Sequence, residues 1–303
     1  MTRVAAIDCG TNSIRLLVTD DGTADLTRRM EIVRLGEGVD RTGRLSDAAL
    51  ERTERALRSY AAAIEELGAT KVRMCATSAS RDASNAADFR AMVRGILGVD
   101  PEVISGDEEA RLSFAGAVRG LTAAAPYLVV DIGGGSTEFV TGTDSVAAAL
   151  SVDVGCVRMT ERHLHGDPPT AAEVAAAEAD ITAAVDRALA AVDGRAAATL
   201  VGLAGSVTTV AALAQGLPGY DPVRIHHARI SYADVARVTA ELLAAPVADR
   251  LALPVMHPGR ADVIGAGALV LRVVMERSGH DAVVASEHDI LDGIAYSMID
   301  GTS

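Results

Sequence analysis

The chain has 303 residues, of which 49% are hydrophobic and 23% are charged. This balance is typical of a globular protein, and the length is sufficient for two compact domains. The net charge of −13 argues against a general nucleic-acid-binding protein, and no apolar run is long enough to cross a bilayer. A strand is predicted to begin by Val4, which leaves no room for a signal peptide, so we expect a cytoplasmic protein without a membrane partner.

The first half of the chain alternates predicted strands and helices. Three strands that form an antiparallel meander are predicted over residues 3–8, 13–20 and 26–35. The helices after the meander are predicted over residues 46–67, 85–97 and 107–119. The strands between these helices are predicted over residues 71–76 and 102–105.

The second half repeats this scheme. Strands are predicted over residues 127–132, 136–142, 146–153, 198–203 and 281–285. Helices are predicted over residues 170–191, 206–215, 232–243, 261–277 and 289–299. A meander followed by alternating helices and strands, present twice, indicates a duplicated α/β architecture. The flexible, proline-ended segment 120–126 marks the boundary, so we expect domains over 1–122 and 123–303, with the alternative that the closing helix 288–303 packs back on the first domain.

Two loops, 8–13 and 131–136, share the pattern Asp-x-Gly-x-x-Ser at the end of an apolar run. The glycines allow a sharp turn and bring amide N–H groups close to an anion, while hydroxyl groups add hydrogen bonds. The residues expected to bind phosphate are therefore Thr11, Asn12, Ser13, Gly133, Gly134, Gly135 and Ser136. Two such loops predict phosphoryl chemistry. The alternative for the second loop is a tight hairpin turn.

Three carboxylates accompany these loops. Asp131 and Glu138 flank the glycines of the second loop, and Asp8 ends the strand before the first. Carboxylates beside a phosphate site favour Mg²⁺ ligation, directly or through water. Any one of the three could instead cap a turn.

Further residues have both a functional and an ordinary interpretation. Gly205 and Ser206 open a predicted helix whose free amides could receive an anion, and Ser206 could equally cap the helix. Arg81 lies in a serine-rich loop at the carboxyl end of a strand, where α/β sheets place ligands, although a lone loop arginine is usually solvated. Glu108 and Glu109 lie in a first helical turn, where acidic residues complement the helix dipole, and the residue pattern alone does not distinguish them.

The cysteines and histidines show no spacing typical of a metal site. We expect Cys9, Cys75 and Cys156 to be buried free thiols, and His226–His227 to be a loop pair.

The chain resembles the exopolyphosphatase/guanosine pentaphosphate phosphatase family, which belongs to the superfamily of actin, hexokinase and the Hsp70 ATPase domain. The segments that carry the resemblance, in their expected order, are 8–13, 76–83, 104–111 and 130–138, with weaker matches at 202–206 and 286–293. The resemblance implies two tandem ribonuclease-H-like, actin-like ATPase domains with the active site in the cleft between them. It further implies that Glu109 orients and deprotonates the attacking water and that Arg81 binds substrate phosphate.

The expected reaction is Mg²⁺-dependent hydrolysis of the terminal phosphoanhydride of inorganic polyphosphate, with Mn²⁺ as a substitute ion. Longer relatives continue into helical C-terminal domains that extend the polyphosphate channel, and their absence from these 303 residues favours short chains. The alternative substrate is guanosine pentaphosphate. A kinase of the same superfamily and a non-catalytic phosphate-binding protein are remoter alternatives. Dimers are common in this family, so a homodimer is compatible with the resemblance.

Overall fold

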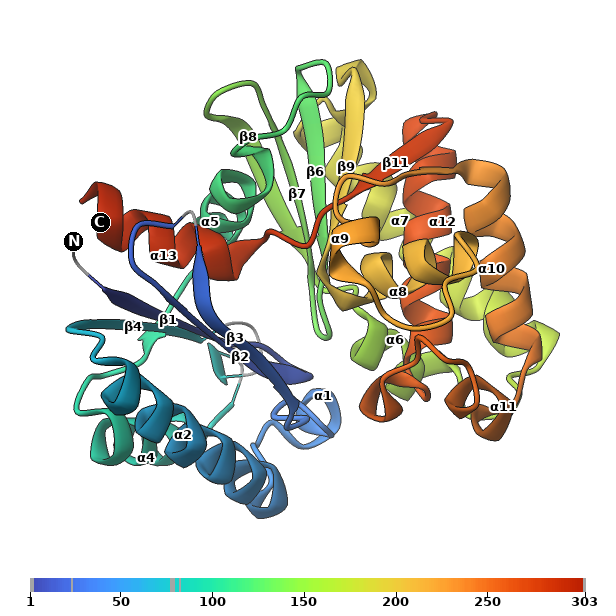
Figure 1. The fold of residues 1–303 in the computed structure, drawn as a ribbon. Helices are drawn as coiled ribbons and strands as arrows, with labels where there is room; N and C mark the ends of the chain where they lie inside the picture. Colours follow the sequence, from blue (N-terminus) through green and yellow to red (C-terminus); the bar gives the residue numbers. More distant parts are fainter. Residues whose placement is uncertain (1–2, 23, 77–79, 82, 302–303) are drawn as a thin grey trace. The chain divides into compact units, whose positions relative to one another are not determined.

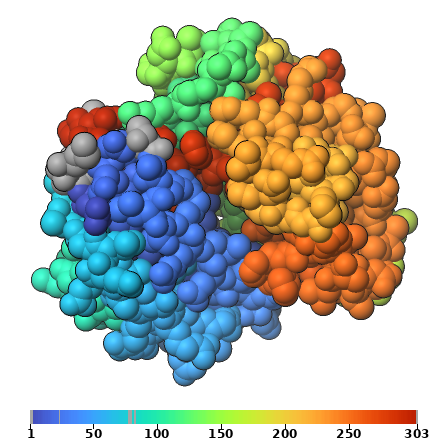
Figure 2. All heavy atoms as spheres, in the orientation of Figure 1, coloured from blue at the N-terminus to red at the C-terminus, as the bar shows by residue number. Residues whose placement is uncertain are grey.

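A computed structural model describes residues 3–22, 24–76, 80–81 and 83–301 (Figure 1). The chain forms two compact units. The first unit consists of the chain up to Gly116 together with the segment from Ile290 to the C-terminal end, and the second unit consists of Ala117–Asp289. Side chains fill the spaces that separate the elements of each unit in the ribbon view (Figure 2).

The described part of the first unit contains a five-stranded sheet in the order β3-β2-β1-β4-β5. Its strands are β1 (Val4–Cys9), β2 (Ser13–Thr19), β3 (Asp25–Ile32), β4 (Lys71–Ala76) and β5 (Glu102–Val103). The central strand β1 pairs antiparallel with β2 and parallel with β4, and all of its residues are buried. Continuous burial follows from helices that cover both faces of the sheet.

The helices of the first unit divide between these two faces. Over the described residues, they are α1 (Val39–Thr42), α2 (Asp47–Leu67), α4 (Ala86–Leu97), α5 (Gly106–Val118) and α13 (Ile290–Asp300). Ala5 and Ile7 of β1 face the cluster that contains the apolar stripes of α2 and α4. Val4 and Ala6 face the cluster that contains Leu112 of α5 and the apolar residues of α13. This alternation is the two-residue period of a strand. In Figure 1, α13 (red) lies along this second face.

The second unit, over its fully described span, contains a six-stranded sheet in the order β10-β11-β9-β6-β7-β8. Its strands are β6 (Tyr127–Ile132), β7 (Thr137–Gly142), β8 (Val146–Val152), β9 (Thr199–Leu203), β10 (Arg229–Ser231) and β11 (Ala282–Ala285). The central strand β6 pairs antiparallel with β7 and parallel with β9, as β1 does with β2 and β4. The expected duplicated α/β arrangement is therefore confirmed.

The helices of the second unit cover its sheet. They are α6 (Cys156–His163), α7 (Ala171–Ala191), α8 (Ala204–Ala214), α9 (Pro222–Ile225), α10 (Tyr232–Ala244), α11 (Val247–Leu251) and α12 (Ile264–Ser278). Short 3₁₀ helices follow α7 at Gly194–Ala196 and precede α12 at Pro258–Arg260. Among the residues described, no helix combines the length and the hydropathy that crossing a bilayer requires.

The longer predicted elements agree with the structure to within a few residues. Helix α2 begins after Ser46, whose Oγ accepts a hydrogen bond from the Ala49 N–H, and it ends at the left-handed Gly68. The prediction of a strand over 26–35 is wrong at its C-terminal end. After Ile32 the backbone no longer pairs with β2, and its N–H groups donate hydrogen bonds to the loop that precedes β2. The helix predicted over 261–277 starts later, at Ile264, because residues 261–263 form a turn in which the Val263 N–H donates to the Arg260 carbonyl.

Several short elements had no sequence prediction, above all α6 and the edge strand β10. Helix α6 has only 8 residues, and its N-cap is Gly155, which offers no capping side chain. Short elements without capping residues carry little local signal, so tertiary contacts decide whether they form. The three cysteines are buried free thiols, as expected.

Candidate active site

The first phosphate loop follows β1 in the first unit. The Gly10 N–H donates to the Ser13 carbonyl at 3.0 Å, which closes a tight turn. Behind this turn, the N–H groups of Val33 and Arg34 donate to the Asn12 carbonyl, and the Gly36 N–H donates to the Thr11 carbonyl. Because C=O and N–H point to opposite sides of a planar trans peptide, the following amides are directed away from segment 33–36. The loop thus has the polarity that an anion site requires.

Asp8 lies beside Arg15 at the start of this loop. The two residues are direct partners in the β1–β2 ladder, and Asp8 Oδ2 accepts hydrogen bonds from Arg15 Nε at 3.0 Å and Nη2 at 2.6 Å. Asp8 is 4% exposed, so the guanidinium offsets the cost of burying its charge. A metal ion at Asp8 would therefore share the carboxylate with Arg15. Burial, and secondarily Asp8, raises the pKa of the neighbouring Cys9 thiol, which keeps it protonated.

Glu109 and Arg81 lie together in the same unit. Glu109 is in the first turn of α5, and its Oε2 is 3.6 Å from Arg81 Nη1. The same Nη1 donates to the Ile104 carbonyl at 2.6 Å, which fixes the guanidinium beside the start of α5. Residues 77–79 and 82, which also belong to the sequence motif around Arg81, lie outside the described residues.

The structure separates Glu109 from its neighbour Glu108. The Glu109 side chain is 10% exposed and faces Arg81, whereas the Glu108 side chain is 37% exposed and lies within 4 Å of Arg73 and Arg111. One position along a helix rotates a side chain by about 100°, so adjacent residues face different surroundings. The residue pattern alone does not make this distinction, and the different surroundings agree with the choice of Glu109 that the family resemblance implies.

The second phosphate loop follows β6 in the second unit. The Gly133 N–H donates to the Ser136 carbonyl at 3.0 Å, the same turn as in the first loop. Three successive carbonyls, those of Gly133, Gly134 and Gly135, accept hydrogen bonds from the start of α6. The amides of Gly134 to Ser136 therefore point to the opposite side, as in an anion-binding nest.

Asp131 and Glu138 are paired beside this loop. They are direct partners in the β6–β7 ladder, so their side chains share one face of the sheet, and they are 7% and 1% exposed. Glu138 Oε1 accepts a hydrogen bond from Ser151 Oγ at 2.8 Å. A cation bound between two adjacent buried carboxylates would offset their mutual repulsion and the cost of burying them. They fit Mg²⁺, which proteins usually hold with one or two carboxylates while water and substrate phosphate supply the other ligands.

No group of three His, Cys, Asp or Glu side chains suited to a metal occurs among the residues that the structure describes. Asp8 belongs to the first unit, whereas Asp131 and Glu138 belong to the second. The first unit thus supplies one of the three predicted metal ligands, and the second unit supplies two.

Gly205 and Ser206 open α8, as predicted, but their surroundings contain a residue that sequence reasoning missed. A Cβ atom on Gly205 would overlap the guanidinium of Arg260, whose Nη1 donates to Thr209 Oγ1 at 2.8 Å. Ser206 is 3% exposed, and a Cβ on Gly267 would overlap its Oγ, so the hydroxyl faces α12. Backbone amides and Arg260 are therefore the groups at this helix start that could meet an anion.

Comparisons with known proteins identify the family of this chain. The Ppx/GppA phosphatase family matches residues 17–301. Exopolyphosphatase 2 of Mycobacterium tuberculosis is 50% identical over 98% of this chain and 99% of its own. A crystal structure described as an exopolyphosphatase-like protein matches with a TM-score of 0.96 at 44% identity, with both chains covered completely. The Aquifex aeolicus family member matches with a TM-score of 0.83 at 30% identity over 100% of this chain and 99% of that chain. The chain therefore belongs to the Ppx/GppA phosphatase family and is a phosphoanhydride hydrolase of the exopolyphosphatase type.

Proposed function

We propose that this protein removes terminal phosphate groups from inorganic polyphosphate. The Mycobacterium tuberculosis relative, named exopolyphosphatase 2, supports this choice of substrate. The observation that carries the proposal is the arrangement of loop 133–136. Its carbonyls accept hydrogen bonds from α6, so its amide N–H groups point away from α6. Two buried carboxylates lie beside the loop. Converging amides next to carboxylates that can hold a cation match a phosphate group with its counter-ion.

Glu109 and Arg81 supply the remaining chemistry in this proposal. Glu109 accepts a proton from the attacking water, and Arg81 Nη1 lies 3.6 Å from its carboxylate. Arg81 binds oxygens of the substrate phosphate through its planar guanidinium, which the Ile104 carbonyl already orients. The hydroxyls and amides of Thr11, Asn12 and Ser13 bind further phosphate oxygens.

Asp131 and Glu138 are the proposed ligands of Mg²⁺, with Mn²⁺ as a substitute. When bound, the ion would neutralise negative charge on the phosphate oxygens as the phosphoanhydride breaks. Ser151 holds one oxygen of Glu138 and so fixes the orientation of this carboxylate. Asp8 remains the third proposed ligand, in competition with its ion pair to Arg15.

The substrate is tested by measuring phosphate release side by side on tripolyphosphate, long polyphosphate, guanosine pentaphosphate and ATP. We expect kcat/KM to be highest with polyphosphate, and short chains to be hydrolysed at least as efficiently per chain end as long ones. A higher kcat/KM with guanosine pentaphosphate would replace the proposed substrate by that nucleotide. Release from none of the four compounds would contradict both. Light scattering on the same sample tests the homodimer with which the family resemblance is compatible.

A further inference from the structure

The start of α6 holds the second phosphate loop from behind. The Cys156 N–H donates to the Gly133 carbonyl at 2.9 Å, and the Val157 and Arg158 N–H groups donate to the Gly134 carbonyl at 2.9 and 3.1 Å. Gly155 makes this approach possible, because a Cβ at this position would overlap the Gly134 carbonyl. The first N–H groups of any helix have no partner within the helix. In α6 these N–H groups donate hydrogen bonds to the loop.

Arg158 adds a side-chain contact to this backbone arrangement. Its Nε donates to the Gly135 carbonyl at 2.7 Å, and its side chain is only 14% exposed. The Gly135 carbonyl belongs to the same peptide group as the Ser136 N–H, so this hydrogen bond fixes the direction of the last amide in the loop. A hydrogen bond from a charged donor is stronger than one between neutral groups.

The first phosphate loop provides an internal comparison. There the carbonyls of Thr11 and Asn12 are held by the backbone of segment 33–36. In the second loop a side chain holds the third carbonyl in addition to the backbone contacts. The orientation of the third carbonyl in the second loop therefore depends on one side chain, that of Arg158, which a substitution can remove.

We propose that Arg158 is a positioning residue for phosphoanhydride hydrolysis: by binding the Gly135 carbonyl, it turns the Gly135–Ser136 amide toward the substrate phosphate. This inference rests on the proposed role of loop 133–136 in binding substrate phosphate. Without the guanidinium, the Gly135 peptide can rotate, and the loop must be reordered each time substrate binds. Binding therefore weakens while the groups that break the phosphoanhydride stay in place.

The experiment compares Arg158→Ala with Arg162→Ala, using tripolyphosphate as substrate. Arg162 lies one turn further along α6 and pairs with Asp180 of α7 at 3.1 Å, so it is a matched control whose guanidinium is bound to another helix. We expect Arg158→Ala to raise KM about tenfold, the usual effect of losing one hydrogen bond to a charged group, with a much smaller change in kcat. Arg162→Ala should leave both constants close to those of the wild type.

A third variant separates positioning from attraction of the substrate by charge. Arg158→Gln keeps an N–H donor near the Gly135 carbonyl but removes the charge, so positioning predicts that KM returns most of the way to the wild-type value. If Arg158 instead attracts the anion directly, Arg158→Gln should resemble Arg158→Ala, and the rise in KM should shrink at high salt. That result would overturn the inference. Melting curves of each variant verify that it is folded.

Gly155→Ala distinguishes failure of this inference from failure of the proposed function. Its Cβ pushes on the Gly134 carbonyl, so it should raise KM if the loop binds substrate. A raised KM for Gly155→Ala with an unchanged KM for Arg158→Ala would reject the role of Arg158 alone. An unchanged KM for both variants would reject the loop as a phosphate site, and absence of hydrolysis by the wild type would reject the proposed function.

Discussion

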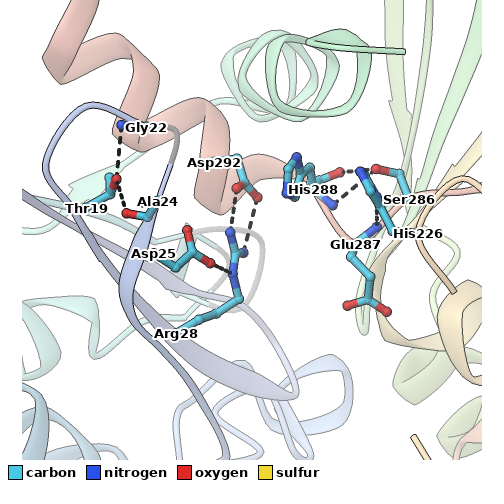
Figure 3. A network of polar contacts seen from close by, with 10 residues as sticks. All are labelled: Thr19, Gly22, Ala24, Asp25, Arg28, His226, Ser286, Glu287, His288 and Asp292. Atoms are coloured by element: carbon cyan, nitrogen blue, oxygen red, sulfur yellow. Dashed lines mark hydrogen bonds and ion pairs between the residues drawn. The ribbon is translucent and has the colours of Figure 1, made fainter. Parts of the chain in front are cut away.

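Arg28 and Asp292 form a bidentate ion pair between β3 and the first turn of α13, across 264 positions of sequence (Figure 3). Arg28 Nη2 is 2.5 Å from Asp292 Oδ1, and its Nε also donates to Asp25 Oδ2 at 2.7 Å. Burial lowers the pKa of Arg28, but Asp292 and Asp25 outweigh burial, so that its pKa is raised. The pair anchors the last helix on the sheet of the first unit.

Asp292→Asn should destabilise the protein by about 1–3 kcal/mol, because it removes a charge-assisted hydrogen bond from a side chain that is 4% exposed. Asp25→Asn is the matched control, since Asp25 contacts the same guanidinium but is 42% exposed, and its effect should stay within about 0.5 kcal/mol. Urea unfolding monitored by circular dichroism measures both. Equal losses in the two variants would contradict the view that the buried contact is the anchor.

Glu109→Gln should lower kcat by about 10²–10⁴-fold while the protein stays folded, because this range is the usual contribution of a positioned general base. Glu108→Gln should have a much smaller effect, since its side chain faces the solvent side of α5 near Arg73 and Arg111. Steady-state phosphate release provides the measurement. Near-normal turnover in Glu109→Gln, or equal losses in both variants, would exclude Glu109 as the base.

Much of the fold could be predicted because its signals are local. The strand before each phosphate loop is a continuous apolar run, and glycines mark the turn that follows. Helix α2 carries a capping serine at its start, Ser46, and a glycine, Gly68, directly after its end. The sequence therefore predicts both α2 and the two loops.

The residues that could not be predicted depend on tertiary contacts. Arg158 reaches its loop only after the β7–β8 hairpin has returned the chain to Gly135. Arg260 meets Gly205 only because the chain that precedes α12 folds back onto the start of α8. Nothing in the local pattern distinguishes either arginine from a solvated one. The closest local signal for Arg260 is the Pro-Gly pair that precedes it.

Gly293→Ala tests how α13 supports the helix that carries Glu109. A Cβ at position 293 would overlap the Leu112 carbonyl, which lies on α5 one turn after Glu109. We expect α5 to shift, kcat to fall, and the protein to lose about 1–3 kcal/mol of stability through overpacking. Assays of turnover and urea unfolding should show both effects together.

Gly95→Ala is the control for this substitution, because it also lies inside a helix, α4, but has open space where the Cβ would stand. Its stability should stay equal or rise by up to about 1 kcal/mol, the advantage of alanine over glycine in a helix. If Gly293→Ala behaved like Gly95→Ala, the close approach of α13 to α5 would have no bearing on Glu109.

Hydrolysis is expected to depend on a divalent metal ion. Activity should vanish in excess EDTA and return with Mg²⁺ or Mn²⁺, because Asp131 and Glu138 place two buried carboxylates beside a loop that binds anions. Glu138→Gln should raise the Mg²⁺ concentration needed for half-maximal activity at least tenfold, since it removes one charged ligand. Asp144→Asn, in the exposed turn between β7 and β8, should leave this concentration unchanged. Full activity in EDTA would refute the metal assignment. A normal Mg²⁺ requirement in Glu138→Gln would instead assign the ion to other residues.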